Sequence, residues 1–163
     1  APRGRAAQMN AGAAAAAGDA LLFLHADTRL PPEADRLVGE ALGAHAWGRF
    51  DVAIDSEDPR LAVIAFFINR RSRLSGIATG DQAIFVRRDV FPGFPPIALM
   101  EDVAFSRSMK RVSPPACLAA RVVTSARRWE RQGVARTVLL MWRLRLAYWR
   151  GADPDELARR YPH

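Results

Sequence analysis

With 163 residues, of which half are hydrophobic, the chain is long enough to bury a substantial core as one domain, which argues against a disordered polypeptide. Its formal net charge of +7 favours an anionic partner, whether nucleic acid, a phosphorylated small molecule or an acidic membrane surface. The single cysteine, Cys117, excludes an internal disulfide and fits a reducing compartment; we expect it to be a small core residue. The longest apolar run, residues 61–68, is too short to span a bilayer.

The first part of the chain alternates helix and strand patterns. Residues 6–17 are mostly strong helix formers, and Gly18 suits a left-handed cap after them. Residues 20–24 form a wholly apolar run, which is typical of a strand buried on both faces of a parallel sheet. A second helix is predicted over residues 31–43, because two prolines and an acid suit its first turn.

The middle of the chain continues this alternation. Residues 47–54 have the period of a half-buried strand, with Arg49 and Asp51 on an exposed face that can carry function. A helix is predicted over 59–74, capped by Asp55 or Ser56. The arginines near its end can be mere partners of the helix dipole; they are Arg70, Arg71 and Arg73.

The last part begins with a strand over 83–86 and a proline-rich loop over 91–96. A helix over 101–111, a strand over 116–124 and helices over 134–150 and 153–161 follow. The sequence therefore predicts a single mixed α/β domain over residues 1–163, in which 134–163 form a helical extension.

Polar residues directly after predicted strands are the first candidates for a site, because ligands of open α/β sheets bind beyond the carboxyl ends of the strands. His25 and Asp27 lie at such a position, where an aspartate can ligate a hard cation that neutralises a departing diphosphate. Equally, Asp27 can cap the next helix and His25 can bond to backbone. Glu101 and Asp102 open a predicted helix, where the dipole favours acids without any catalytic duty.

Four landmarks follow one another along the chain: residues 4–28 with Leu-His-Ala-Asp-Thr at their end, Pro-Gly-Phe at 92–94, Glu-Asp at 101–102, and Ser-Ala-Arg-Arg-Trp at 125–129. In this order they resemble the Asp-x-Asp strand, the Gly-Gly-Phe loop, the Glu-Asp motif and the Arg-Arg-Trp region of family 2 glycosyltransferases. Together with Gly-Asp-Gln at 80–82, the residues of these motifs are most similar to those of the bacterial arsenosugar-biosynthesis-type subgroup.

The resemblance implies a GT-A fold, a Rossmann-like mixed sheet flanked by helices, whose first strand–helix units would precede Ala1. It also implies an inverting transfer of a sugar from a nucleoside diphosphate donor to an acceptor hydroxyl, with Asp102 as the base and Glu101 as an orienting acid. His25 stands where the family has the leading acid of Asp-x-Asp, so Asp27 is the better ligand for Mn²⁺ or Mg²⁺ and His25 the weaker one.

Further roles implied by the resemblance each have a structural alternative. Arg127 and Arg128 would bind phosphate beside a wall formed by Trp129, or else form a solvated basic turn beside a packed tryptophan. Asp81 and Gln82 would contact sugar hydroxyls, or else simply form a turn.

Asn10 would lie near the donor. Gly12 would also lie near the donor, although a close approach of helix and sheet at this glycine is the preferred explanation.

Two other classes of function stay open: a catalytically inactive GT-A-like binding module and a basic nucleic-acid-binding protein. The second is less favoured, because the chain lacks a clear platform of exposed aromatic side chains among its arginines on which bases could stack. Interleaved Leu, Trp and Arg over 134–150 suggest peripheral contact with the inner face of a cytoplasmic membrane, although core packing explains the same pattern. The donor sugar, the acceptor and any homo-oligomer are left open by the sequence.

Overall fold

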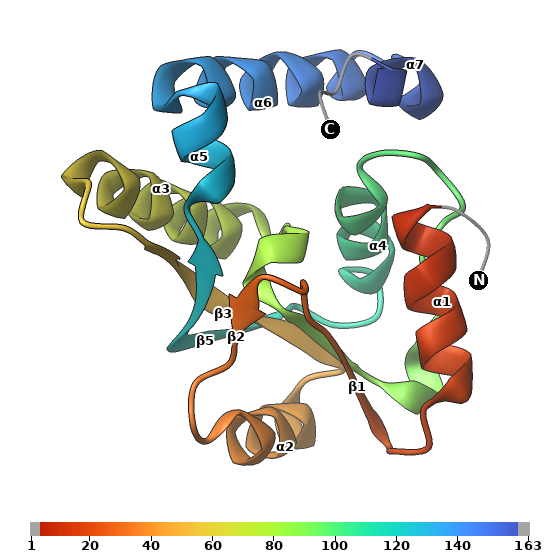
Figure 1. Cartoon of the computed structure of the whole chain (residues 1–163). Coiled ribbons are helices and arrows are strands. Elements are labelled where there is room, and N and C mark those ends of the chain that lie inside the picture. The colour runs from red at the N-terminus through yellow and green to blue at the C-terminus, as the bar shows by residue number, and fades with distance from the viewer. Residues whose placement is uncertain (1–3, 160–163) are drawn as a thin grey trace.

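Five strands form one mixed sheet in the computed structural model, which describes residues 4–159 (Figure 1). The strand order is β1-β4-β3-β5-β2. Only β3 and β5 run parallel, whereas β1 with β4, β3 with β4 and β2 with β5 are antiparallel. The strands are β1 (Ala20–Phe23), β2 (Thr28–Arg29), β3 (Trp47–Asp55), β4 (Ile84–Arg87) and β5 (Ala116–Ser125).

Helices lie on both sides of this sheet (Figure 1). The α-helices are α1 (Arg5–Ala15), α2 (Ala34–Ala44), α3 (Pro59–Ser75), α4 (Glu101–Met109), α5 (Arg127–Gln132), α6 (Val134–Trp149) and α7 (Pro154–Arg159), and the 3₁₀ helices are η1 (Gly80–Gln82) and η2 (Arg88–Val90). The predicted mixed α/β class is confirmed, and most predicted elements agree within one or two residues. The predicted end of the last helix, residues 160–161, lies outside the described residues.

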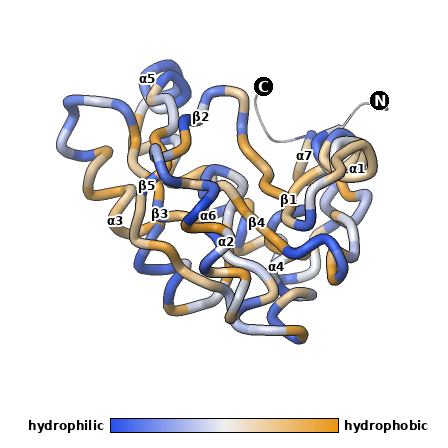
Figure 2. The backbone as a smooth tube through the Cα atoms, turned by 90° about the horizontal axis from the view of Figure 1, so that it is seen from below, coloured by the Kyte–Doolittle hydropathy of each residue, from blue (hydrophilic) through white to orange (hydrophobic). Residues whose placement is uncertain are grey.

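The core consists of three apolar clusters. One joins α1 and α4 to the sheet through residues such as Leu21, Trp47 and Phe105. A second packs α2 on the sheet around Phe50 and Phe85. Figure 2 shows the hydrophobic colour along β1 and β4, in keeping with the apolar side chains that these strands supply to the two clusters.

The third cluster attaches α6 and α7 to the start of α4, through Leu144 and Leu157 packed with Met100 and Val103. It holds the C-terminal helices along one edge of the molecule, on the side remote from α2 (Figure 1).

Two strand predictions need correction. The apolar run of β1 predicted a strand inside a parallel sheet, but β1 is an end strand of the sheet, antiparallel to β4. Its apolar character has a different cause, since Phe23 packs against Phe91 and Phe94 of the proline-rich loop at ring-centroid distances of 5.4 and 4.8 Å. On β3, Arg49 was expected on an exposed face but is fully buried, because its charge is paired inside the protein.

Three predicted details at helix ends and at Cys117 are also wrong. Helix α1 ends at Ala15 rather than 17, and Gly18 forms no left-handed cap; the carbonyl oxygens of Ala13, Ala16 and Gly18 instead accept hydrogen bonds from the guanidinium of Arg88. Helix α3 is capped by Asp58, whose carboxylate accepts from the Arg60 N–H at 2.9 Å, rather than by Asp55 or Ser56. Cys117 is only partly buried.

Candidate functional site

The polar segment after β1 meets the start of α4 through one arginine. Arg5, the first residue of α1, donates a hydrogen bond from Nη2 to Nε2 of His25. Its Nε lies 3.2 Å from Oε1 of Glu101, the first residue of α4. Arg5 thus joins two of the predicted motifs. It lies within the first motif segment but was not predicted as a site residue, because nothing in its spacing distinguishes it from an ordinary helix-start residue.

The contact with Arg5 determines which tautomer His25 adopts. A guanidinium group has only donors, so Nε2 of His25 must accept and its proton resides on Nδ1. Burial and the charge of Arg5 lower the pKa of His25 below 6.5, whereas Asp81, Asp27 and Asp102 act in the opposite direction. Asp27, Asp81 and Asp102 thus all lie within electrostatic reach of one neutral imidazole.

The η1 turn closes this site from another side. The backbone N–H of Gly80 donates to Oδ2 of Asp102 at 2.9 Å. A Cβ atom on Gly80 would lie only 2.6 Å from Nε2 of His25 and would also overlap Arg5. Glycine is therefore required here by space, because the turn is pressed against the Arg5–His25 pair.

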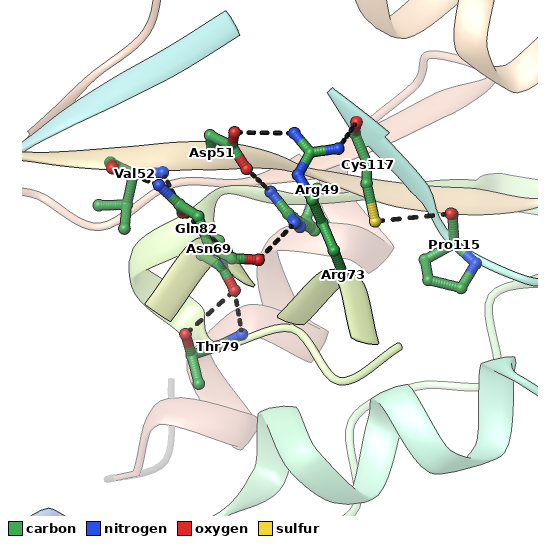
Figure 3. A network of polar contacts seen from close by, with 9 residues as sticks. All are labelled: Arg49, Asp51, Val52, Asn69, Arg73, Thr79, Gln82, Pro115 and Cys117. Atoms are coloured by element: carbon green, nitrogen blue, oxygen red, sulfur yellow. Dashed lines mark hydrogen bonds and ion pairs between the residues drawn. The ribbon is translucent and has the colours of Figure 1, made fainter. Parts of the chain in front are cut away.

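A buried polar network holds η1 in this position (Figure 3). Gln82 is fully buried, and its Oε1 accepts from the backbone N–H and the hydroxyl of Thr79 at 3.2 and 3.3 Å. Its Nε2 donates to Oδ1 of Asn69 at 3.4 Å, and Asn69 binds both backbone groups of Val52 on β3. The amide of Gln82 is thus used within the protein, so we assign it a positioning role in place of the predicted sugar contact.

The same network neutralises the buried charge on β3. Arg49 donates to Asp51 and to the carbonyl oxygen of Asn69, and Arg73 donates to the other oxygen of Asp51 at 2.8 Å (Figure 3). Arg73 also donates to the carbonyl oxygen of Cys117 at 3.0 Å. This side of α3 therefore fastens the helix to β3 and β5.

Asp81 and Arg71 are buried polar groups that the protein leaves incompletely paired. Oδ1 of Asp81 and both Nε and Nη2 of Arg71 are buried without a hydrogen-bond partner among the described residues. Burial, aided by the charges of Arg145 and Arg49, lowers the pKa of Arg71 to about 10 against the opposing influence of Asp81 and Asp102. Such atoms are uncommon in folded proteins, and here they are available to hydrogen-bond a polar ligand or water. From its position in the sequence, Arg71 was expected only to interact with the helix dipole.

Asn10 does not point to an open site. Its amide donates to the carbonyl oxygen of Phe94 and accepts from the Phe94 N–H, both at 2.8 Å. It therefore pins the Pro-Gly-Phe loop, in which Gly93 has a φ of +84°. Gly12 is exposed, with nothing within 4 Å of a Cβ built on it, so the predicted close approach of helix and sheet at this glycine is wrong.

The Arg-Arg-Trp segment forms α5, a helix that the sequence did not predict. Arg127 is exposed, whereas Arg128 and Trp129 are half-buried. Burial, followed by the charge of Arg5, lowers the pKa of Arg128, and Asp81 acts against this. Arg128 thus lies within electrostatic reach of Arg5 and Asp81, whereas Arg127 is solvated at the start of a helix and not in the basic turn that the alternative predicted.

Asp27 is the carboxylate best suited to hold a metal ion. It is exposed, and its carboxylate accepts only a long hydrogen bond of 3.5 Å from the Thr28 hydroxyl within the described residues. His25 already accepts a hydrogen bond from a cation. No group of three or more histidine, cysteine or acidic side chains within residues 4–159 is arranged to hold a metal ion. A hard cation at Asp27 would thus take further oxygens from a bound ligand and water, as Mg²⁺ commonly does at phosphate sites.

No family model, curated protein or solved structure matches the chain. The mixed sheet with flanking helices is compatible with a Rossmann-like fold. Within residues 4–159, every helix is too short or too polar to cross a bilayer.

Proposed function

We propose that the chain is the catalytic core of an inverting glycosyltransferase of the GT-A type, which moves a sugar from a nucleoside diphosphate donor to an acceptor hydroxyl. The observation that supports this proposal is that Arg5 contacts both His25 and Glu101 and that Gly80 binds Asp102 beside this pair, while Asp27, Asp81 and Asp102 all lie within electrostatic reach of His25. The cations Arg5, Arg71 and Arg128 are electrostatically coupled to the same group of side chains. Residues from separate motifs thus supply both a base and a set of anion-binding groups at one place.

Asp102 is the base of this proposal. Its Oδ2 is held by the Gly80 N–H, and its Oδ1 accepts from the N–H of Val103 at 2.7 Å, so the carboxylate is oriented before any substrate arrives. The carboxylate takes the acceptor's hydroxyl proton while the hydroxyl oxygen forms a bond to the anomeric carbon. The bond from that carbon to the diphosphate oxygen breaks, and its electron pair leaves with the diphosphate. General base catalysis of this kind typically contributes about 10²- to 10⁴-fold to the rate.

The guanidinium groups of Arg71 and Arg128 would bind the diphosphate. Nε and Nη2 of Arg71 are buried donors that need an acceptor, and phosphate oxygens match the fork of a guanidinium group. Asp27 would hold a divalent cation, Mn²⁺ or Mg²⁺, which supplies additional positive charge to the leaving diphosphate. Oδ1 of Asp81 is a buried acceptor that no other group of residues 4–159 satisfies, and it would receive a hydrogen bond from a sugar hydroxyl.

Glu101 has a positioning role in this scheme. Burial and the neighbouring Asp102 raise the pKa of Glu101, and Arg5 opposes the rise. Because Arg5 also donates to His25, Glu101 fixes the arginine that holds the imidazole neutral.

The experiment compares the wild-type chain with Asp27→Asn, Asp102→Asn and the control Asp19→Asn, which changes an exposed aspartate before β1. Calorimetric titration with UDP, GDP and dTDP in the presence and absence of Mn²⁺ measures binding. Release of the diphosphate from the corresponding sugar nucleotides, with water or a polyol as acceptor, measures turnover.

We expect Asp27→Asn to weaken Mn²⁺-dependent binding about tenfold or more. We expect Asp102→Asn to keep binding and to lower turnover by roughly 10²-fold or more. Asp19→Asn should match the wild type. The proposal is wrong if no nucleoside diphosphate binds, or if binding survives intact in Asp27→Asn and turnover survives intact in Asp102→Asn. Binding without any turnover in the wild type would instead indicate an inactive binding module.

A further inference from the structure

Helix α6 presents an apolar stripe to solvent. Leu139, Trp142, Leu146 and Trp149 have exposed fractions of 52%, 74%, 51% and 75%. Their spacing of three, four and three residues places them on one face of the helix. The opposite face, which includes Leu144, packs in the third core cluster. Core packing therefore explains only the inner face of α6: Trp142 projects from the fold, and Trp149 is largely exposed although the guanidinium of Arg107 lies 5.8 Å from the centre of its ring.

Positive charge accompanies this stripe. Arg136, Arg143 and Arg150 are exposed and recur every seven residues, so they follow the same side of the helix. None of the three forms an ion pair with a carboxylate of the described chain. The sequence between Glu130 and Asp153 contains five arginines and no acid. The stripe is thus bordered by uncompensated cations.

An open hollow lies on this face. It has a volume of about 510 Å³ and is lined by Arg143, Leu146, Ala147, Arg150, Gly151 and Ala152. Two guanidinium groups beside an apolar wall suit a phosphate that is attached to an acyl chain, because the guanidinium fork binds phosphate oxygens.

We propose that this stripe docks α6 in the plane of an anionic lipid bilayer. Trp142 and Trp149 enter the boundary between headgroups and acyl chains, a position that suits a ring with one polar edge. Arg143 and Arg150 bind lipid phosphates at the hollow. Figure 1 shows α6 along one edge of the molecule, so a flat surface can approach it without displacing other elements.

The leucines favour lipid over nucleic acid. A single-stranded nucleic acid would stack its bases on Trp142 and Trp149, but Leu139 and Leu146 offer no stacking surface. A bilayer buries all four side chains of the stripe together. Membrane docking is independent of sugar transfer, since none of these residues belongs to the proposed catalytic site.

The test is flotation of the full chain with vesicles of phosphatidylglycerol and phosphatidylcholine in equal parts, and with vesicles of phosphatidylcholine alone. The variants are Trp142→Ser/Trp149→Ser, Arg143→Ala/Arg150→Ala, and the control Val112→Ser, which changes an apolar residue that is 56% exposed elsewhere on the surface. Brominated lipid quenches the fluorescence of tryptophans that insert, and the tryptophan double variant, which keeps only Trp47 and Trp129, shows how much of the quenching belongs to the two α6 rings. Circular dichroism and urea unfolding check that each variant is folded.

We expect the wild type and Val112→Ser to float only with the anionic vesicles, and brominated lipid to quench the α6 tryptophans. The arginine double variant should bind the anionic vesicles about thirtyfold more weakly, from roughly fivefold for each arginine near the surface. The tryptophan double variant should stay at the bottom of the gradient. The inference is overturned if the wild type stays there too, or if the folded tryptophan variant floats as well as the wild type. It is also overturned if a mixed-sequence oligonucleotide binds in preference to the vesicles, or if the stripe proves to join two copies of the chain in sedimentation.

Discussion

Gly80→Ala is the most direct test of how the site is assembled. The new Cβ would lie 2.6 Å from Nε2 of His25, whereas ordinary van der Waals contact begins near 3.4 Å. The imidazole would therefore have to retreat by about 0.8 Å and the Arg5 side chain, which lies closer still, by about 1 Å. A misplacement of about 1 Å near reacting groups can lower a rate by about 10²-fold. Because Gly80 is not among the glycines with positive φ, alanine adds no backbone strain there.

We therefore expect Gly80→Ala to lower turnover roughly tenfold to a hundredfold while the free energy of unfolding changes by less than about 1 kcal/mol. A second readout needs no substrate. Because Arg5 lowers the pKa of His25, displacing Arg5 should raise it, and NMR titration of the three histidines measures this directly.

The matched control is Gly12→Ala, where a Cβ atom meets nothing within 4 Å. This variant should leave the pKa of His25 unchanged. The reasoning fails if wild-type His25 titrates at or above 6.5, or if Gly80→Ala leaves both that pKa and the turnover unaltered.

Three further substitutions test stability. Gly48→Ala should lower the free energy of unfolding in urea by about 1–3 kcal/mol or more, since its Cβ would lie 2.5 Å from the Ala116 carbonyl oxygen. Gly12→Ala should instead raise the free energy of unfolding by about 0.5–1 kcal/mol. Equal effects of the two substitutions would contradict both assignments. Asn10→Ala should cost about 1–3 kcal/mol and expose the backbone N–H of Phe94 to hydrogen exchange; an unchanged exchange rate would show that the loop is held by other contacts. The folded pKa of Glu101 is raised above 4.5, so its contribution to stability is present below pH 4.5 and is lost as the pH rises through the folded pKa. In Glu101→Gln, urea unfolding should therefore show a smaller decrease in the free energy of unfolding across this pH range. A pH profile identical to that of the wild type would refute the assignment.

The element pattern was predictable from the sequence because it follows from local apolar periodicity. The α3 and α6 segments show this, since their predicted and observed bounds differ by a single residue. Apolar periodicity reports burial but not strand direction, and so β1 was placed in a parallel sheet. The two-residue strand β2 has no periodicity of its own; it exists because Thr28 and Thr124 pair across to β5.

The candidate site was predictable as a set of motifs but not as a set of contacts. Asp27, Asp81 and Asp102, which belong to separate motifs, all lie within electrostatic reach of His25. The roles of Arg5 and Arg71 depend on which distant groups they meet, and an arginine within a helix gives no local signal of that. Conversely, Asn10 and Gln82 have the residue types of ligand-binding amides, yet both are used to hold backbone.

Residues whose conformation or burial costs free energy lie beside η1, which contains Asp81, and beside the start of α4 at Glu101. Within residues 4–159, the non-glycine residues with positive φ are Ala83, which follows η1, and Met100, which precedes Glu101. Such backbone typically costs about 1–3 kcal/mol for each residue and persists where the surrounding structure enforces it. The buried acid Glu101 and the incompletely paired guanidinium of Arg71 add electrostatic cost at the same place. An anionic ligand that binds Arg71 would relieve part of this cost in the folded state alone, so its binding should also stabilise the fold.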